Sequence, residues 1–240
     1  MSDQITYFKT LENFETSKFF EHKKLQLDLD QKIIGEQKCN AFCQALSNCV
    51  NLQSLCLQIG CNSINNQQVS QIGAAIAKCK NIWWLSVWLS YNNIDSQGIS
   101  DFAFSITSCT NLKKLSIAIV ENHISSKGAS DLGEAFSSLN NIQILSINLW
   151  ENNILDEGAS KLIEFLTKST TLQHLSLGFY GNKIQTQNTS GLITQIAKFK
   201  RLQYLSIDIR RNNIEFTQEK LIRRNIKKIL KLVKYSILFF

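Results

Sequence analysis

Residues 111–124 read NLKKLSIAIVENHI, and this stretch, together with the segment after it, decides the fold. Large aliphatic side chains alternate with smaller ones, as at Ile117 and Ile119. This alternation predicts a short β-strand with one buried face. Further on, Leu132 and Phe136 stand at the spacing of one face of an α-helix. The unit is therefore predicted to be a strand, a turn and a helix.

The same unit recurs every 30 residues, and no insertion breaks the register between copies. One strand and one helix cannot bury their apolar stripe alone, so the stacked copies predict a repeat solenoid. Gly98, Gly128 and Gly158 recur just ahead of the predicted helices, where the chain is expected to turn. The copies that align with residues 111–124 are NLQSLCLQIGCNSI from 51, NIWWLSVWLSYNNI from 81, NIQILSINLWENNI from 141, TLQHLSLGFYGNKI from 171, RLQYLSIDIRRNNI from 201 and a degenerate first copy, EHKKLQLDLDQKII, from 21.

The unequal widths of the two elements predict a curved stack. Neighbouring strands lie about 4.8 Å apart, whereas helices with their side chains are about 10 Å wide. The predicted fold class is α/β, a right-handed solenoid (horseshoe) with parallel strands on the concave face and helices on the convex face. The predicted division is an N-terminal cap at 1–20, seven repeats at 21–230, the last merging into a cap, and a C-terminal cap extension at 231–240.

The seven cysteines and three histidines do not indicate a metal site. No two cysteines form a C-x-x-C pair, so zinc spacing is missing, and neither a metal nor a cofactor is expected. Cys49, Cys79 and Cys109 occupy the same position in three successive copies, which predicts small, buried, reduced side chains. The N-terminal segment does not read as a secretory signal, and no apolar run is long enough to cross a membrane. A cytoplasmic location is therefore expected, with the nucleus as an alternative.

The frame L-x-x-L-x-L-x-[LIF]-x-x-N-x-I, followed by an amphipathic helix, resembles the leucine-rich repeats of the ribonuclease-inhibitor type over roughly residues 22–229. The resemblance implies that the asparagine of each copy bonds backbone groups in the turn after the strand and passes the bonding to the next repeat. An unpaired buried amide costs about 1–3 kcal/mol, so this role is structural rather than catalytic. The asparagines at this position are Asn62, Asn92, Asn122, Asn152, Asn182 and Asn212, and Lys32 stands there in the first copy.

The sequence departs from the common consensus of that family in the length of its strand segment. The asparagine is the eleventh residue of the frame rather than the ninth, which predicts a longer alternation with more exposed strand positions. Repeats of this length also resemble those of long arrays that are sometimes joined to a protein-kinase domain. This chain has no glycine-rich nucleotide loop, no H-R-D and no D-F-G, so no kinase activity carries over.

Aromatic residues gather at outward positions of the predicted strands. Three of the four tryptophans fall in the copy that begins at residue 81, where the aliphatic residues of the alternation are predicted to face the core. Trp88 then faces solvent and is predicted to form, with Trp150 and Tyr180, an aromatic band that anchors a protein partner. The predicted partner-binding residues are Trp84, Trp88, Tyr91, Glu121, Trp150, Glu151, Tyr180, Asp208 and Arg210, with Arg211 at the edge.

An alternative interpretation is that neighbouring aromatic side chains only cover each other. Such pairs stabilise a sheet by about 0.2–1 kcal/mol without any partner. This interpretation is favoured for Trp83 and Trp84, which lie near the start of the predicted strand.

The C-terminal segment carries most of the net charge. Residues 218–240 contain seven Lys or Arg residues and one Glu, a net charge of +6 out of +7 for the whole chain. Apolar residues at helical spacing, from Leu221 to Val233, predict an amphipathic helix that caps the last repeat. The alternative is contact with an acidic membrane surface or partner. The rest of the chain is nearly neutral, so nucleic acid is not an expected partner.

No set of residues in the sequence indicates catalysis. His174 and Ser176 fall on the same outward strand face, but no acidic residue falls where it could orient the histidine. The sequence therefore predicts a non-enzymatic protein-binding scaffold or adaptor without a cofactor or small-molecule substrate. Two alternatives stay open. One is a peripheral membrane or anionic-surface adaptor that uses the basic C-terminal helix, and the other is a regulator of an enzyme such as a small GTPase, which rests on fold-level analogy.

Overall fold

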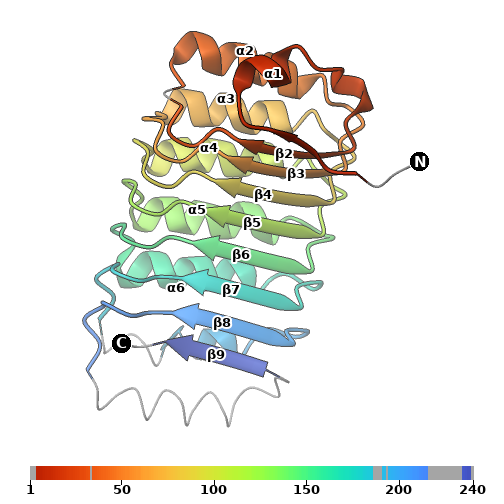
Figure 1. Cartoon of the computed structure of the whole chain (residues 1–240). Coiled ribbons are helices and arrows are strands. Elements are labelled where there is room, and N and C mark those ends of the chain that lie inside the picture. The colour runs from red at the N-terminus through yellow and green to blue at the C-terminus, as the bar shows by residue number, and fades with distance from the viewer. Residues whose placement is uncertain (1–3, 33, 186–190, 193, 216–233, 239–240) are drawn as a thin grey trace.

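The computed structural model describes residues 4–32, 34–185, 191–192, 194–215 and 234–238. Within them, the strands form one parallel sheet whose order follows the sequence, with helices stacked behind it (Figure 1). The strands are β1 (Thr6–Phe8), β2 (Lys24–Asp28), β3 (Ser54–Gln58), β4 (Trp84–Trp88), β5 (Lys114–Ala118), β6 (Ile144–Asn148), β7 (His174–Gly178), β8 (Tyr204–Asp208) and β9 (Lys234–Leu238). The helices are α1 (Leu11–Glu15), α2 (Glu36–Ser47), α3 (Asn66–Ile76), α4 (Ser96–Ile106), α5 (Ser126–Ser137) and α6 (Leu155–Leu166), with a short 3-10 helix at Phe19–Glu21.

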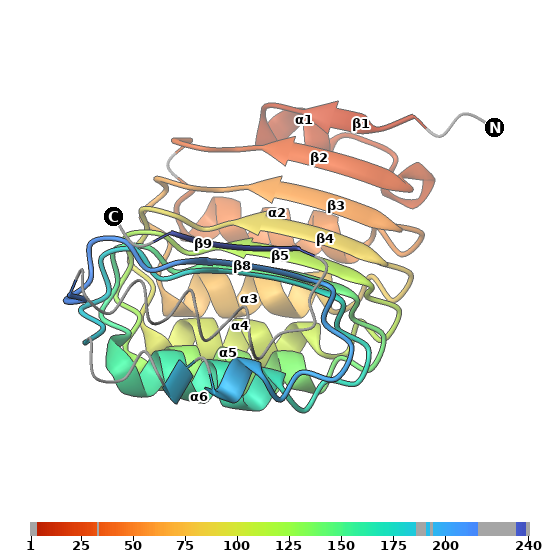
Figure 2. The same ribbon diagram turned by 90° about the horizontal axis from the view of Figure 1, so that it is seen from below.

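The strands and the helices lie on opposite sides of a curved stack, as Figure 2 shows. Hydrogen-bonded strands sit about 4.8 Å apart and packed helices about 10 Å apart, so the strand side is the inner, concave side. The predicted α/β leucine-rich-repeat solenoid, with parallel strands inside and helices outside, is confirmed as the fold class.

Neighbouring strands pair residues at equivalent positions of successive repeats, so Leu85 of β4 lies beside Leu115 of β5. The pairing continues beyond the end of β4, since the backbone N–H of Tyr91 donates to the carbonyl of Val120 at 2.8 Å. This continuation agrees with the longer alternation expected from the sequence. It brings additional outward positions of each repeat onto the concave face.

The described part of the sheet ends at β9, which keeps the register of the preceding strands. Ser206 of β8 lies beside Ser236 of β9, one repeat length further along the chain. Residues 231–240 were expected to form a cap extension, and residues 234–238 within that segment occupy the strand position of another repeat. The amphipathic helix expected between Leu221 and Val233 lies outside the described residues.

Inward side chains form one core along the whole stack. Val87 and Leu89, like their counterparts in the other repeats, are fully buried. Cys49, Cys79 and Cys109 are also fully buried, which confirms the interpretation of these residues as small hydrophobic side chains. Burial raises the pKa of the Cys49 and Cys79 thiols to about 12 and that of Cys109 to about 11.

A sharp turn follows each strand at one fixed position of the repeat. The residue there has a positive φ, a left-handed conformation that costs about 1–2 kcal/mol for a residue with a side chain. Only one of these residues is glycine, so side chains are retained where glycine would fit more easily. The residues are Gln31, Cys61, Tyr91, Glu121, Glu151, Gly181 and Arg211, with φ from 48° to 67°.

The asparagine that follows this turn bonds to backbone groups of the preceding repeat. Oδ1 of Asn152 accepts from the N–H of Ile124 at 2.9 Å, and its Nδ2 donates to the carbonyl of Ile119 at 2.8 Å. Nδ2 of Asn152 also donates to the carbonyls of Leu149 and Trp150 in its own turn, so these amides link each repeat to its neighbour, as the resemblance implied. The same backward bond to a carbonyl is made by Asn62, Asn92, Asn122, Asn182 and Asn212.

A second row of asparagines, which was not predicted from the sequence, joins the repeats at the other end of the strands. Nδ2 of Asn111 donates to the carbonyl of Lys80 at 3.0 Å. Asn51, Asn81 and Asn141 make the equivalent bond in other repeats. Their recurrence at one position of the repeat was the signal that could have revealed them. These side chains are exposed, so water can replace their hydrogen bonds when they are lost.

The recurring glycines do not turn the chain ahead of the helices, as was expected. Gly98, Gly128 and Gly158 lie inside the first turns of α4, α5 and α6. A Cβ at Gly158 would stand 2.7 Å from the Cα of Ser126 in the preceding helix. Glycine is therefore needed there because neighbouring helices approach each other closely.

Candidate partner-binding face

Two aromatic side chains, one at the end of β4 and one in the turn after it, are exposed on the concave face. Trp88 is 47% exposed and Tyr91 is 52% exposed. The inward residue between them, Leu89, is fully buried. The alternation predicted from the sequence thus places Trp88 in solvent, and the left-handed turn at Tyr91 turns that side chain away from the core as well.

Trp88 and Tyr91 line a groove that crosses β4, β5 and β6. The groove has a volume of about 370 Å³, and Trp150 lines it from the β6 side. Its floor consists of polar and aliphatic residues from the middle of the sheet, and none of them is aromatic. These floor residues are Ser90, Ser116, Ile117, Ala118, Val120, Ser146 and Asn148.

Trp150 leans toward β7 and is half-buried, so it is less exposed than was expected from the sequence. Its indole covers Gly178, where an added Cβ would stand 2.6 Å from Nε1. The ring also packs against Tyr180, with 5.4 Å between the ring centroids. Nε1 is buried and has no hydrogen-bond partner, which fits a ring held by packing. Trp150 therefore lines the groove and also covers the sheet at Gly178.

Tyr180 is flanked by two arginines. The guanidinium groups of Arg210 and Arg211 lie 5.7 and 5.4 Å from the centre of its ring. Asp208 accepts two bonds from Arg210, from Nε to Oδ1 at 2.9 Å and from Nη2 to Oδ2 at 2.7 Å. Asp208 is only 7% exposed, because Arg210 covers it, and its role as a contact for the partner stays a prediction. Its carboxylate holds Arg210 against the ring.

Two carboxylates directly follow residues that line the groove, Glu121 after Val120 and Glu151 after Trp150. Glu121 and Glu151 are exposed and occupy the left-handed position after their strands. The negative charge of Glu121 raises the pKa of Tyr91, so the two side chains lie near each other. The carboxylate of Glu151 lies over Gly181, where an added Cβ would stand 2.6 Å from Oε2. The edge of the groove next to these residues is therefore acidic.

The other two tryptophans lie at the opposite end of β4 from Trp88. Trp84 is half-buried, and Trp83, just before the strand, has the ammonium group of Lys114 at 5.8 Å from a ring centre. This contact fits the interpretation that Trp83 and Trp84 cover neighbouring strands. Neither residue lines the groove beside Trp88.

The residues considered for chemistry do not converge on a reactive site. His174 packs against the ring of Tyr204, with 5.9 Å between the ring centroids. Ser176 lies in the row of outward serines, beside Ser146 and Ser206. Among the residues that the structure describes, no cluster of three or more His, Cys, Asp or Glu side chains could hold a metal ion.

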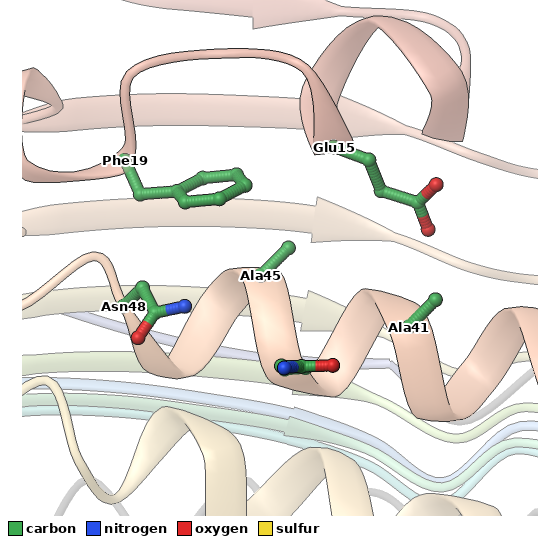
Figure 3. Close-up of a pocket in the computed structure, with 6 residues that line it drawn as sticks. Glu15, Phe19, Ala41, Ala45 and Asn48 are labelled. Atoms are coloured by element: carbon green, nitrogen blue, oxygen red, sulfur yellow. The ribbon is translucent and has the colours of Figure 1, made fainter.

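A smaller hollow lies at the N-terminal end, between α1 and α2. Figure 3 shows Glu15 and Phe19 beside Ala41 and Ala45 of α2 and Asn48 at the end of that helix. The hollow has a volume of about 250 Å³. The packing of α1 against the first repeat creates this hollow, and its lining has one ionisable group. It was not foreseen from the sequence, because it depends on how the N-terminal segment folds back.

Known proteins give little further information about this chain. No protein-family model matches it, and none of the curated proteins matches it. One solved structure that matches is described as "Leiomodin-1 Actin-Binding Site 2 (ABS2)", with 14% sequence identity, coverage of 78% of this chain and 88% of that chain, and a TM-score of 0.46. The actin binding in that description is a property of that protein. In the described part of this chain, no helix has the length and apolar character needed to cross a membrane.

Proposed function

We propose that this protein is a non-enzymatic scaffold or adaptor that binds a protein partner with the concave face around Trp88. The observation that carries this proposal is the exposure of Trp88 and Tyr91 beside a groove of about 370 Å³. Exposed aromatic residues that rim a groove are enriched among the residues that dominate protein–protein binding. Solenoids also present their concave surfaces to partners.

Two further parts of the proposal concern the type of repeat and the location. We propose that the repeats are of the ribonuclease-inhibitor type, which the strand–helix unit and the buried asparagines support. A cytoplasmic location is supported by the seven free thiols, because disulfides form readily in oxidising compartments. The nucleus is an alternative with the same redox state.

The proposal is tested by affinity capture from a native lysate, in which the amount of each retained protein is compared between wild type and matched variants. The bait is the full-length chain, and the partner proteins that it retains are compared with those retained by Trp88→Ala. The control is Phe104→Ala, because Phe104 is a similarly exposed aromatic residue, at 45%, on the convex helix α4. Proteins lost with Trp88→Ala and kept with Phe104→Ala support the concave face. Identical partners for all three baits would move the binding surface elsewhere.

A further inference from the structure

The groove between Trp88 and Trp150 has features that select one chemistry of partner side chain, and the inference drawn from them rests on the function proposed above. β4 and β6 are separated by two strand spacings, roughly 10 Å. Trp88 and Tyr91 stand at one margin of that interval, and the half-buried Trp150, which leans toward β7, lines the other. A flat group from a partner can therefore enter between the two indoles and contact the floor.

The floor of the groove combines the apolar side chains Ile117, Ala118 and Val120 with the polar side chains of Ser116, Ser146 and Asn148. Ser116 and Ser146 contribute hydroxyl groups to this lining, whereas Oδ1 of Asn148 already accepts from the backbone N–H of Trp150 at 3.1 Å. An apolar group would remove water from the two hydroxyl oxygens and offer no hydrogen bond in return. A group with several N–H donors would satisfy them, and a guanidinium carries five such donors in one plane.

The edge of the groove adds a negative charge to the aromatic wall. Glu121 is exposed and directly follows Val120 of the groove lining, and its charge acts on Tyr91, which is part of the wall. Aromatic faces attract cations, and the attraction grows when a carboxylate is close by. In the described ranges, no basic group of the chain itself lies over Trp88, Tyr91 or Trp150.

The protein already contains this combination of groups, occupied, on the next strands. Arg210 lies against the ring of Tyr180 and is held by the carboxylate of Asp208. The groove beside Trp88 presents the same two components, an aromatic face and the carboxylate of Glu121. There the chain contributes no guanidinium of its own within the described residues.

From this geometry we infer that the groove between Trp88 and Trp150 binds the guanidinium group of an arginine side chain from a protein partner. The planar group stacks on the indole of Trp88, donates to the serine hydroxyl oxygens of the floor, and pairs with Glu121. A lysine ammonium carries the same charge but is not planar and makes fewer directed bonds, so it fits the slot less well.

Peptide selection on the full-length chain tests this inference without knowledge of the natural partner. Random nonapeptides displayed on phage are selected on the immobilised protein, and the strongest binder is synthesised with each of its arginines replaced in turn by citrulline and by lysine. Citrulline keeps the plane and removes the charge. We expect the selected peptides to share an arginine whose change to citrulline weakens binding at least about tenfold, with lysine intermediate.

Matched variants of the protein assign the effect to the groove. Trp88→Ala is expected to abolish the preference for arginine over citrulline, whereas Phe104→Ala on the convex face leaves it unchanged. Glu121→Gln is expected to weaken the arginine peptide severalfold and to reduce its salt dependence. Glu134→Gln removes the same charge from an exposed position on α5 and serves as the control.

The outcomes separate this inference from the proposed function. Selected peptides that depend on Trp88 but contain no common arginine would overturn the guanidinium site and leave the partner-binding face in place. A selection that yields no peptide, or one insensitive to Trp88→Ala, also overturns the guanidinium site. The proposed function then stands or falls with the lysate capture.

Discussion

Nδ2 of Asn122 donates a hydrogen bond to the carbonyl of Leu89, in the preceding repeat, at 3.0 Å. Oδ1 of the same amide accepts from the N–H of Ile94 at 3.1 Å. A single buried side chain thus satisfies a donor and an acceptor in the turn of that repeat. This bonding fixes the turns on which the candidate binding residues stand.

Replacement of Asn122 by leucine is expected to destabilise the protein by about 2–4 kcal/mol, because several buried backbone groups lose their partner. Urea unfolding followed by circular dichroism gives the free energy of unfolding. Asn141→Ala is the control, since Asn141 is exposed and water can replace its bond. Equal unfolding free energies for wild type and Asn122→Leu would contradict the structural role of the buried row.

Close helix packing is tested by adding one methyl group. A Cβ at Gly133 would stand 2.8 Å from both the Cα and the carbonyl oxygen of Leu162. Gly133→Ala is therefore expected to cost about 1–3 kcal/mol as α5 and α6 move apart. Gly35→Ala, where no atom lies within 4 Å of the added Cβ, should leave the melting temperature nearly unchanged. Similar melting temperatures for both variants would show that the helices are not so close.

Trp150 and Trp88 are expected to differ in their contribution to stability. Trp88 is exposed, so Trp88→Ala should cost less than about 1 kcal/mol. Trp150 covers Gly178 and packs on Tyr180, so Trp150→Ala should cost about 2 kcal/mol or more. Gly178→Ala should displace the indole without removing it and lower the melting temperature in the same direction. Equal costs for both tryptophans would place Trp150 in solvent as well.

Alkaline pH is expected to destabilise the protein through its buried thiols. Burial raises the pKa of Cys49 and Cys79 to about 12 and that of Cys109 to about 11, from an ordinary value of 9.0. Between these values the unfolded chain has already lost the thiol protons and the folded chain has not, so stability is full below pH 9 and falls as pH rises toward 12.

Urea midpoints measured at several pH values between about 7 and 11 test this expectation. The decline should be smaller in Cys79→Ala than in wild type, because one of the three raised thiols is gone. Cys61→Ala, at an exposed position, is the control and should decline like wild type. An identical decline in Cys79→Ala and wild type would assign the alkaline loss to other groups.

The repeat length and the alternation along each strand were sufficient to predict the strands, the core and the exposure of Trp88. These features depend on local pattern, and the pairing of Leu85 with Leu115 follows once the register of the repeats is known. The position of Trp150 could not be obtained in the same way. It depends on Gly178 in the next repeat having no side chain to block the indole.

Asp208 shows the same limit of pattern-based reasoning at a charged residue. The alternation places it on the outward face, and it does lie there, but Arg210 covers it through two hydrogen bonds. Exposure of an outward residue depends on which neighbouring side chain is long enough to reach it. The role of Gly158 was missed for a related reason, since a glycine between repeats reads as a turn unless the distance to the neighbouring helix is known.

The central claim is that the surface around Trp88 serves binding and contributes little to folding. The most direct measurement compares the two effects of Trp88→Ala on the same preparation: the free energy of unfolding in urea, and the affinity for a partner recovered by wild-type capture. The account predicts a loss of less than about 1 kcal/mol in stability and at least about 2 kcal/mol in binding, roughly thirtyfold in affinity. A variant that unfolds much more easily, or one that folds normally and binds the partner with unchanged affinity, would contradict the account.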